Sequence, residues 1–597
     1  MVRELDGHQV FGLFREGARS LDARRAELDR INVFPVPDGD TGSNMALTLR
    51  FAVEAAQVSD SAALTLGSLA ESALAGARGN SGVILAQFIV GLAESLGEAA
   101  RVDMERFARA VAHAYASARH AVREPRDGTI LSVIRDWAAA LHREQARSSG
   151  FPALFRAAHP DLEQALAATT GQLEVLRAAG VVDAGASGFV AFVAGGSAYL
   201  ESGAPRLPEQ DVALPEAPFP EDAGWDMGAD PRKGPRYCSE FFLLPASGKL
   251  DLEALGRDLD GQGDSLIVAG GARGARVHIH TDDPAGAMNR VAALGRVRDQ
   301  KVDDMHRQFE DARLDHGRVA LLTDSCCDLP QELLDRHRIH VVPLTLRFGE
   351  VEYLDRLTLD PATLYDRLDA APVFPASSQP APAVFERAYQ RLLAHHDRVL
   401  ALHVASRLSG TFEASRRAAA RIDPARITVL DTKHLSGSLG LLVLQAARLL
   451  ESGLDPDTLV AQFPALRDGA SILVSVRTLE SMVRGGRVSP LGGRLARLLN
   501  LKPIVSVDET GASKLYGAAF SVEQNLRKIV RMVAERHTRA PIRSWAVVHG
   551  ANPAGARDLA SRVERVLGFP PEHLSGISAV VGMNAGRGAV AVVSLSF

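Results

Sequence analysis

Two aspartates stand one residue apart near the start of the chain, in the stretch NVFPVPDGDTGSNM at residues 32–45. Carboxylates at positions i and i+2 of a loop can converge on one hard cation, and Mg²⁺ commonly takes one or two carboxylates together with phosphate oxygens. Asp38 and Asp40 are therefore candidate metal ligands, weighed against the common alternative of a solvated Asp-Gly turn. An EF-hand is excluded, because the fifth and twelfth loop positions would be Gly42 and Leu49.

Three further polar stretches that contain glycine follow along the chain: GARGNSG at 76–82, RDGTIL at 126–131 and VDAGASG at 182–188. Each is expected at a helix start, where exposed backbone N–H groups can bind phosphate. No G-x-x-x-x-G-K-[ST] sequence occurs, so a P-loop enzyme is excluded. Together the four stretches predict an ATP site built from loops between helices.

The elements that position these loops are predicted to be helices. Residues 8–203 carry apolar side chains at three- and four-residue spacing with short polar interruptions, which is typical of an antiparallel helical bundle. From 204 to 235 the composition changes to a stretch rich in proline and acidic residues, which is predicted to be a linker.

Residues 236–310 mix strand-like and helical runs and predict a small α+β domain. Cys238 lies in the first strand-like run, and His278 and His280 lie in VHIHTDDP. Residues i and i+2 of a strand point to one face, so both imidazoles can reach one ion, and Cys with two His suits Zn²⁺. The alternatives are incidental histidines on a buried strand, or a histidine that takes part in phosphotransfer.

Residues 317–597 alternate buried strands with amphipathic helices, which predicts an α/β region with a largely parallel sheet. Hydroxyl groups occur at predicted helix starts, and an arginine follows a tight Gly-Gly turn, a combination that suits a carboxylate. For each motif taken separately, the alternative is a helix cap or a turn. The candidates are Thr323, Asp324 and Ser325 after the first strand, then Ser377, Ser378, Ser409, Thr411 and Arg487.

The composition excludes several classes of protein. A net charge of -5 over 597 residues does not favour a nucleic-acid partner, and three cysteines allow no disulfide framework. The N-terminal residues lack an apolar signal region, and no apolar run is expected to span a bilayer, so we expect no integral membrane segment and a cytoplasmic location.

The four N-terminal stretches, in this order, resemble the nucleotide-binding domain of bacterial fatty acid kinase, which belongs to the dihydroxyacetone kinase L-subunit (DhaL) family of eight-helix barrels. The resemblance covers residues 8–203. It implies that Asp38 and Asp40 hold two Mg²⁺ ions, and Asn32 stands near the place of a third aspartate in the dihydroxyacetone branch. Residues implied to contact the phosphates or line the ATP site are Thr41, Gly42, Ser43, Asn44, Asn80, Ser81, Thr129, Asp183, Ala184 and Gly185.

The rest of the chain resembles two further families. Cys238, His278 and His280 match the middle domain of fatty acid kinase, which carries a Cys/His metal site. TDS..DLP, SSQP, LSGT and GGR resemble the DegV family of two-lobed proteins that bind one long acyl chain. By that pattern Ser377, Ser378, Ser409, Thr411 and Arg487 would surround the carboxylate. Where the family often has a histidine near the end of the chain, this one has NAGRG, with Asn584 and Arg587, and Cys326 and Cys327 replace usual small residues.

These resemblances predict one multidomain chain that joins an all-α DhaL-type barrel, a small α+β middle domain and an α/β DegV-type region. The implied reaction is ATP-dependent phosphorylation of a long-chain fatty acid held by the chain's own DegV domain. A homodimer and a downstream acyltransferase are the expected protein partners. The alternatives are phosphorylation of dihydroxyacetone or a similar small hydroxy-ketone, and a lipid-binding or transfer protein without catalysis.

Overall fold

The computed structural model describes residues 2–34, 39–204, 231–245, 250–271, 274–313, 319–371, 373–488 and 501–597. Asp38 and most of the predicted linker therefore lie outside the described residues. The chain divides into two compact units, Met1–Arg313 and Leu314–Phe597.

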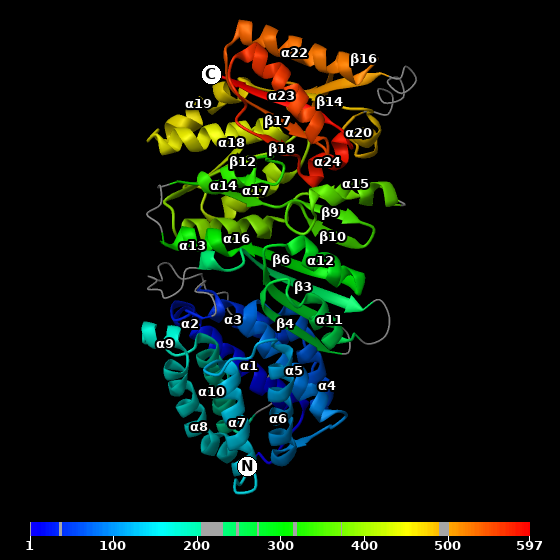
Figure 1. The fold of residues 1–597 in the computed structure, drawn as a ribbon. Helices are drawn as coiled ribbons and strands as arrows, with labels where there is room; N and C mark the ends of the chain where they lie inside the picture. The colour runs from blue at the N-terminus through cyan, green and yellow to red at the C-terminus, as the bar shows by residue number, and fades with distance from the viewer. Residues whose placement is uncertain are drawn as a thin grey trace. The chain divides into compact units, whose positions relative to one another are not determined.

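The N-terminal part of the first unit is helical, as predicted (Figure 1). Eight of its described helices have 14 to 22 residues, which agrees with an eight-helix barrel, and α2 and α9 have six each. Their buried faces form one apolar core, which includes Phe88, Trp137 and Phe189. The helices are α1 (Gly7–Ala23), α2 (Arg25–Arg30), α3 (Thr41–Glu54), α4 (Ala62–Gly76), α5 (Gly79–Leu96), α6 (Met104–Ala121), α7 (Ile130–Glu144), α8 (Phe151–Gln172), α9 (Glu174–Ala179) and α10 (Ala184–Glu201), and β1 (Glu4–Leu5) pairs with β2 (Val102–Asp103).

Helix α5 corrects one expectation from the sequence. By length and composition alone it is apolar enough to cross a membrane, and it is the one such helix in the described part of the chain. However, 67% of it is buried within the structure. A central helix surrounded by others is apolar on all sides, and this burial accounts for its composition.

The middle domain is an antiparallel sheet in the order β4-β5-β3-β6, with helices α11 (Leu252–Leu259), α12 (Pro284–Ala293) and α13 (Met305–Arg313). Its strands are β3 (Tyr237–Pro245), β4 (Asp264–Gly271), β5 (Gly274–Thr281) and β6 (Gly295–Asp304). One face is apolar and buried, with Phe241, Val277 and Ile279 at 0% exposure. The sequence analysis did not predict β6, because this strand, GRVRDQKVDD, is polar on both faces.

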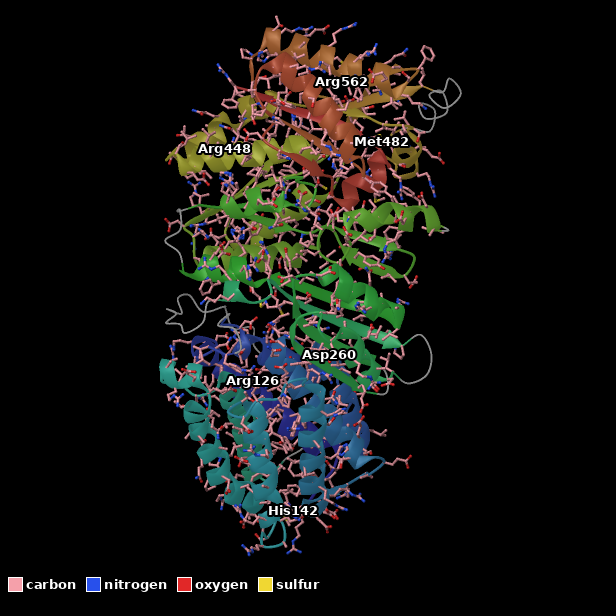
Figure 2. The ribbon with its side chains drawn as sticks, viewed as in Figure 1. Arg126, His142, Asp260, Arg448, Met482 and Arg562 are labelled. Carbon is pink, nitrogen blue, oxygen red and sulfur yellow. The ribbon has the colours of Figure 1, made fainter. Side chains whose placement is uncertain are left out.

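The sheet contacts the helical domain through hydrogen bonds and ion pairs. The amide of Gly270 on β4 donates to Oε1 of Gln87 on α5 at 2.7 Å. Arg123, just after α6, pairs with Asp260, which is labelled in Figure 2. The helical domain and the middle domain therefore form one unit, and the sheet lies next to the start of α5.

In the second unit, the first lobe contains a four-stranded parallel sheet in the order β13-β12-β7-β8 and a three-stranded antiparallel sheet in the order β10-β9-β11. Pro343 separates β8 from β9, so the predicted run RIHVVPLTL serves two sheets. The strands are β7 (Val319–Asp324), β8 (Ile339–Val342), β9 (Thr345–Phe348), β10 (Val351–Leu354), β11 (Ala376–Ser378), β12 (Arg398–His403) and β13 (Ile427–Asp431). The helices from α14 onward are α14 (Gln331–Arg336), α15 (Pro361–Ala370), α16 (Pro382–Leu393), α17 (Thr411–Ile422), α18 (Ser436–Glu451) and α19 (Pro456–Asp468).

The second lobe contradicts the prediction of a largely parallel sheet. Its six strands lie in the order β16-β15-β14-β19-β17-β18, and only β17 and β18 are parallel. Buried strands have the same apolar composition in both arrangements, so composition alone did not reveal the direction of pairing. The elements are β14 (Ala470–Ser475), α20 (Glu480–Arg484), β15 (Lys502–Val507), β16 (Ser513–Ala519), α22 (Val522–Arg539), β17 (Ile542–His549), α23 (Pro553–Leu567), β18 (Leu574–Gly576), α24 (Ala579–Ala585) and β19 (Val590–Ser596).

Candidate active site and ligand pocket

All four N-terminal motifs lie at helix starts, which was predicted for the last three of them. Helices α3, α5, α7 and α10 begin at Thr41, Gly79, Ile130 and Ala184. Asp40 occupies the N-cap position of α3, yet its side chain makes no capping hydrogen bond to that helix. Asp40 also lines the pocket described below, beside the start of this helix.

Asp29, a residue that the sequence analysis missed, fixes the start of α3 through hydrogen bonds with Ser43. Its carboxylate accepts from the amide of Ser43 at 2.9 Å and from Oγ of Ser43 at 2.7 Å. Burial raises the pKa of Asp29 to about 6, although the bonds from Ser43 act in the opposite direction. A Cβ at Gly42 would stand 2.5 Å from the carbonyl oxygen of Arg25, so only glycine fits there.

The start of α5 lies against the start of α3. Gly79 has φ of +60°, and a Cβ there would stand 2.4 Å from Nδ2 of Asn44. Oδ1 of the next residue, Asn80, is buried and has no hydrogen-bond partner among the described residues. A Cβ at Gly185 would stand 2.7 Å from Oγ of Ser81, so the start of α10 also closely approaches this place.

Asp183 supports the site from outside the pocket. Its side chain caps α10 by accepting from the amide of Ala186 at 2.8 Å, and it also accepts from the amide of Ile130, at the start of α7. Burial raises the pKa of Asp183 to about 6. Thr129 donates to the carbonyl oxygen of Arg126 at 2.9 Å. Thr129, Asp183, Ala184 and Gly185 do not line the pocket described next, so their part in it is to hold the helix starts in place.

A pocket of about 470 Å³ lies between the helix starts and the middle domain. From the helical domain it is lined by Asn32, Asp40, Thr41, Asn44, Gly79, Asn80 and Ser81. From the middle domain it is lined by Cys238, His278, His280, Lys301, Asp303 and Gln308. Four predicted ATP-site residues (Thr41, Asn44, Asn80 and Ser81) therefore face the same cavity as Asp40 and the Cys/His set, which the sequence analysis treated as two sites.

The geometry of Cys238, His278 and His280 fits a metal ion. One ligand atom from each lies within 4.8 Å of the others, and the two Nε2 atoms are 3.2 Å apart. Nδ1 of His278 lies 3.5 Å from Oε1 of Glu240, and Nδ1 of His280 lies 3.4 Å from Oδ1 of Asp264. A carboxylate on the second ring nitrogen is the usual support of a metal-bound histidine. These residues would hold Zn²⁺ with one position left open.

Glu240 links this cluster to the start of α5. It is fully buried and accepts from the amide of Gly79 at 2.6 Å and from the guanidinium of Arg276 at 2.9 Å. Arg276, also fully buried, bonds Asp299 at 2.9 Å, and Asp299 pairs with Arg78 at 3.0 Å. Burial opposes the charged form of Glu240, but the bond with His278 and the nearby cations keep its pKa below the usual value.

The second unit contains a larger pocket, of about 950 Å³. Its polar lining includes Ser377, Ser409 and Arg487, three of the eight candidates from the sequence, together with Asn584 of the NAGRG stretch and His549, which the sequence analysis missed. Met482, labelled in Figure 2, contributes to the lining from α20. The rest of the lining is mainly aliphatic, from Leu344, Val404, Leu408, Leu435, Ile472, Val474, Val505, Val507, Val548, Ile577, Val580, Val581, Val590 and several alanines.

The remaining predicted residues of this region lie away from the lining. Thr411 is fully buried, and its hydroxyl is 2.8 Å from that of Ser409, so it orients a lining residue. Ser378 pairs with Thr345 on β9 and does not line the pocket. Arg587 pairs with Asp366 at 2.5 Å, so in this structure it is engaged with the protein.

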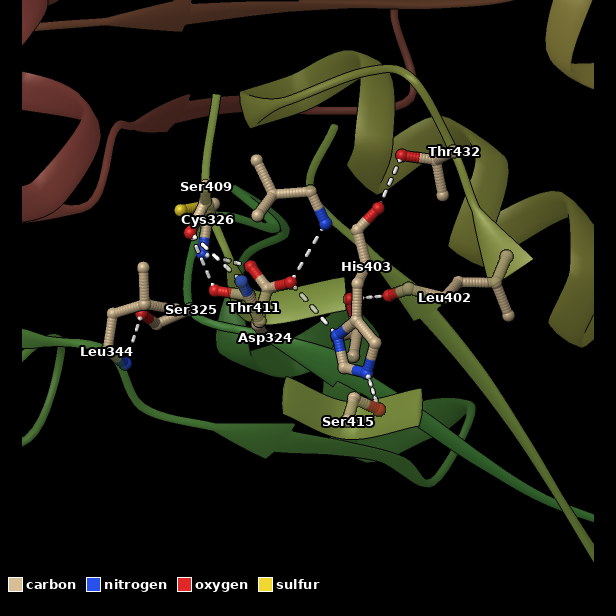
Figure 3. A network of polar contacts seen from close by, with 12 residues as sticks. Asp324, Ser325, Cys326, Leu344, Leu402, His403, Ser409, Thr411, Ser415 and Thr432 are labelled. Atoms are coloured by element: carbon tan, nitrogen blue, oxygen red, sulfur yellow. Dashed lines mark hydrogen bonds and ion pairs between the residues drawn. The ribbon is translucent and has the colours of Figure 1, made fainter. Parts of the chain in front are cut away.

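Figure 3 shows a buried network behind this pocket. Asp324 lies 3.0 Å from Nδ1 of His403, and Nε2 of His403 lies 2.8 Å from Oγ of Ser415. These residues have the order of a hydrolase triad. All three are at 0% exposure and none lines the pocket, so the network fastens β7 to β12.

Cys326 and Cys327 are buried beside this network, and Cys326 lines the pocket. Burial raises the pKa of Cys326 well above its ordinary value and that of Cys327 to about 12. Both side chains are therefore protonated near neutral pH and act as small packing groups.

Two buried carboxylates join the lobes on either side of the pocket. Asp328 accepts from Oγ of Ser436 at 2.6 Å and from the amide of Ser578 at 2.7 Å. Asp355 accepts from Oγ of Ser325 at 2.7 Å and from the amide of Ala579 at 2.8 Å. The first lobe therefore caps the start of α24 in the second lobe.

Asp328 predicts a pH dependence of stability. Burial raises its pKa from 3.8 to about 7, so between these values the folded chain binds a proton that the unfolded chain has lost. Stability therefore falls as pH rises towards 7. From pH 5 to 8, the free energy of unfolding of wild type should fall by about 3 kcal/mol more than that of Asp328→Asn. Urea titrations of this unfolding transition measure the difference. The exposed control Asp397→Asn should follow wild type, and equal slopes in Asp328→Asn would contradict the assignment.

Sequence models of three protein families match the chain. The DAK2 domain matches residues 35–198, the FakA-like middle domain of fatty acid kinase matches 234–312, and the DegV family, described as uncharacterised, matches 318–596. In chain order, the first unit matches the DAK2 domain and the FakA-like middle domain, and the second unit matches the DegV family. The chain has the domain composition of a FakA-like fatty acid kinase protein fused to a DegV protein.

Similar proteins cover parts of the chain. Protein YloV of Bacillus subtilis is 31% identical over 316 residues, which are 51% of this chain, and this chain spans 57% of YloV. A DegV domain-containing protein of Clostridium acetobutylicum is 26% identical over 279 residues, 46% of this chain and 98% of the relative. Among solved structures, a fatty-acid-binding DegV family protein from Thermus thermophilus is 31% identical and matches 47% of this chain and all of its own, with a TM-score of 0.44.

Proposed function

We propose that this chain is a fatty acid kinase that transfers the γ-phosphoryl group of ATP to the carboxylate of a long-chain fatty acid bound by its own DegV domain. The observation that carries the proposal is the pocket of the first unit. It gathers Asp40, the backbone of two helix starts and the amides of Asn44 and Asn80 in one cavity. Such a set of groups suits a nucleotide's phosphates and their cation.

In the proposed reaction a carboxylate oxygen attacks the γ-phosphorus, and the bond to the β,γ-bridging oxygen breaks. ADP leaves with that oxygen, and the product is an acyl phosphate. A carboxylic acid with a pKa of about 4 to 5 is already ionised at neutral pH, so no general base is needed. Bound Mg²⁺ would supply charge neutralisation, and Asp38 and Asp40 are the residues proposed to hold it.

The second pocket supports a fatty acid as the substrate. Its lining is mainly aliphatic, with a few polar groups, which is typical of a pocket for an apolar ligand. Ser377, Ser409 and Arg487 provide hydrogen-bond donors and a positive charge for a carboxylate. The acyl phosphate product is reactive, so an acyltransferase is proposed to consume it. The homodimer and the cytoplasmic location remain predictions.

The test is an incubation of the pure chain with Mg-ATP, long-chain fatty acids and hydroxylamine. An acyl phosphate would be trapped as a fatty hydroxamate, identified by mass spectrometry, and the same sample without ATP is the control. ADP formation only with an added small ketone would favour the dihydroxyacetone alternative. Bound fatty acid without ATP consumption would favour a lipid carrier.

A pocket-filling substitution tests the acyl site separately. Ile472 and Val474 line the pocket from β14, whereas Leu473 between them packs into the core of the second lobe. Val474→Trp should occupy the space of an acyl chain and weaken fatty acid binding at least about a hundredfold, since each excluded methylene forfeits about 0.8 kcal/mol. Calorimetric titration with oleate measures the affinity. Val566→Trp, at an exposed position on α23, is the control. Unchanged affinity in Val474→Trp would mean that the acyl chain lies elsewhere.

A further inference from the structure

Lys301 reaches the candidate active site from the strand that the sequence did not reveal. In the sheet register, Lys301 on β6 is paired with Glu240 on β3, and Asp303 is paired with Cys238. On β5, His278 and His280 are the partners of the same two β3 residues. Paired and alternate residues of a sheet share one face. Lys301 therefore stands on the face that carries the metal cluster, and it lines the same pocket as Asp40.

Lys301 is held in its charged form. Its Nζ lies 2.7 Å from Oδ2 of Asp303, and its side chain is 32% exposed. Burial disfavours the ammonium, but the charges of Asp303, Glu240 and Asp40 outweigh this and keep the pKa of Lys301 well above its ordinary value. A cation is thus fixed beside the helix starts proposed to bind phosphate.

Within the described lining of this pocket, Lys301 is the one lysine or arginine. Phosphoryl transfer places negative charge on the oxygens of the moving group, and kinases place a fixed cation against it. The chain has no P-loop lysine to do this.

We propose that Lys301 contacts the γ-phosphoryl group during transfer, so that the middle domain supplies a catalytic residue to the site on the helical domain. This inference rests on the kinase activity proposed above. The ammonium keeps its proton throughout. It contacts the oxygens of the transferred phosphoryl group both in ATP and in the acyl phosphate. Asp303 orients the ammonium.

The test compares Lys301→Met, Lys301→Arg and the control Arg298→Met. Arg298 is an exposed cation on the same strand and does not line the pocket. In Lys301→Met, the kcat for hydroxamate formation should fall about a thousandfold below that of wild type. The kcat of Lys301→Arg should be at least about tenfold higher than that of Lys301→Met. Arg298→Met should match wild type. Zinc content and melting temperature should be unchanged in all three.

Measurements of nucleotide affinity test the role of Lys301 separately from the proposed kinase activity, because binding can be measured without turnover. The affinity of Lys301→Met for a non-hydrolysable ATP analogue should fall about tenfold, whereas its affinity for ADP should stay within about twofold of wild type. Equal losses for both nucleotides, or no loss, would overturn the role of Lys301 at the γ-phosphoryl group. If wild type made no hydroxamate, the proposed function would fail, and the analogue-to-ADP ratio would still decide whether Lys301 contacts this group.

Discussion

Replacing Asp40 by asparagine is expected to lower ATP-dependent hydroxamate formation at least about a thousandfold. The asparagine would keep the size of the side chain, so the substitution removes the charge alone. The side chain of Asp40 makes no capping hydrogen bond to α3, so this helix should still begin at Thr41. What is lost is a carboxylate for the cation that screens the phosphates.

The matched control is Asp103→Asn, because Asp103 is also an N-cap of the helical domain and accepts from the amide of Arg106 at 2.8 Å. It should retain full turnover. Fatty acid binding should be unchanged in both variants, since the larger pocket belongs to the second unit. Retention of more than about a tenth of wild-type turnover by Asp40→Asn would show that Asp40 is not a required metal ligand.

Removing one ligand of the Cys/His cluster is expected to have the second large effect. His278→Ala should reduce the zinc content from about one ion per chain to near zero, because changes even to second-shell partners cost roughly 10- to 100-fold in metal affinity. Turnover should fall with it, since the cluster lines the pocket that contains Asp40. Elemental analysis of the purified chain, with turnover on the same sample, makes the measurement.

His142→Ala is the control for a lost imidazole, because His142 lies on the exposed surface of α7, at a position labelled in Figure 2. It should keep both zinc and activity. Full zinc content in His278→Ala would mean that the cluster is not a metal site. Loss of zinc with full turnover would give the ion a purely structural role.

Much of the first unit was predictable from the sequence, because the decisive signals are local. The glycine-containing motifs fixed the starts of α3, α5, α7 and α10, since helix starts depend on residues close in the chain. The i, i+2 spacing of His278 and His280 placed both on one face of a strand. Asp38 lies outside the described residues, so its assignment remains a prediction.

The sequence did not reveal Asp29, because a single carboxylate on a short helix carries no pattern. Its role arises from a contact with Ser43, fourteen residues away, that forms only when α2 and α3 pack. His549 is similar, since β17 brings it to the pocket through pairing in the sheet. The direction of pairing in the second lobe was wrong for the same reason, because it depends on the order of strands in space.

The sequence by itself thus determined the helical, α+β and α/β character of successive regions, the helix starts proposed to bind phosphate and the Cys/His set. Only the tertiary structure decided that these belong to one cavity and that β6 brings Lys301 and Asp303 into it. The physical reason is that a strand with both faces polar shows no apolar alternation. The position of β6 is set by its long-range pairing with β3. Its polar side chains Lys301 and Asp303 are explained by the pocket that they line.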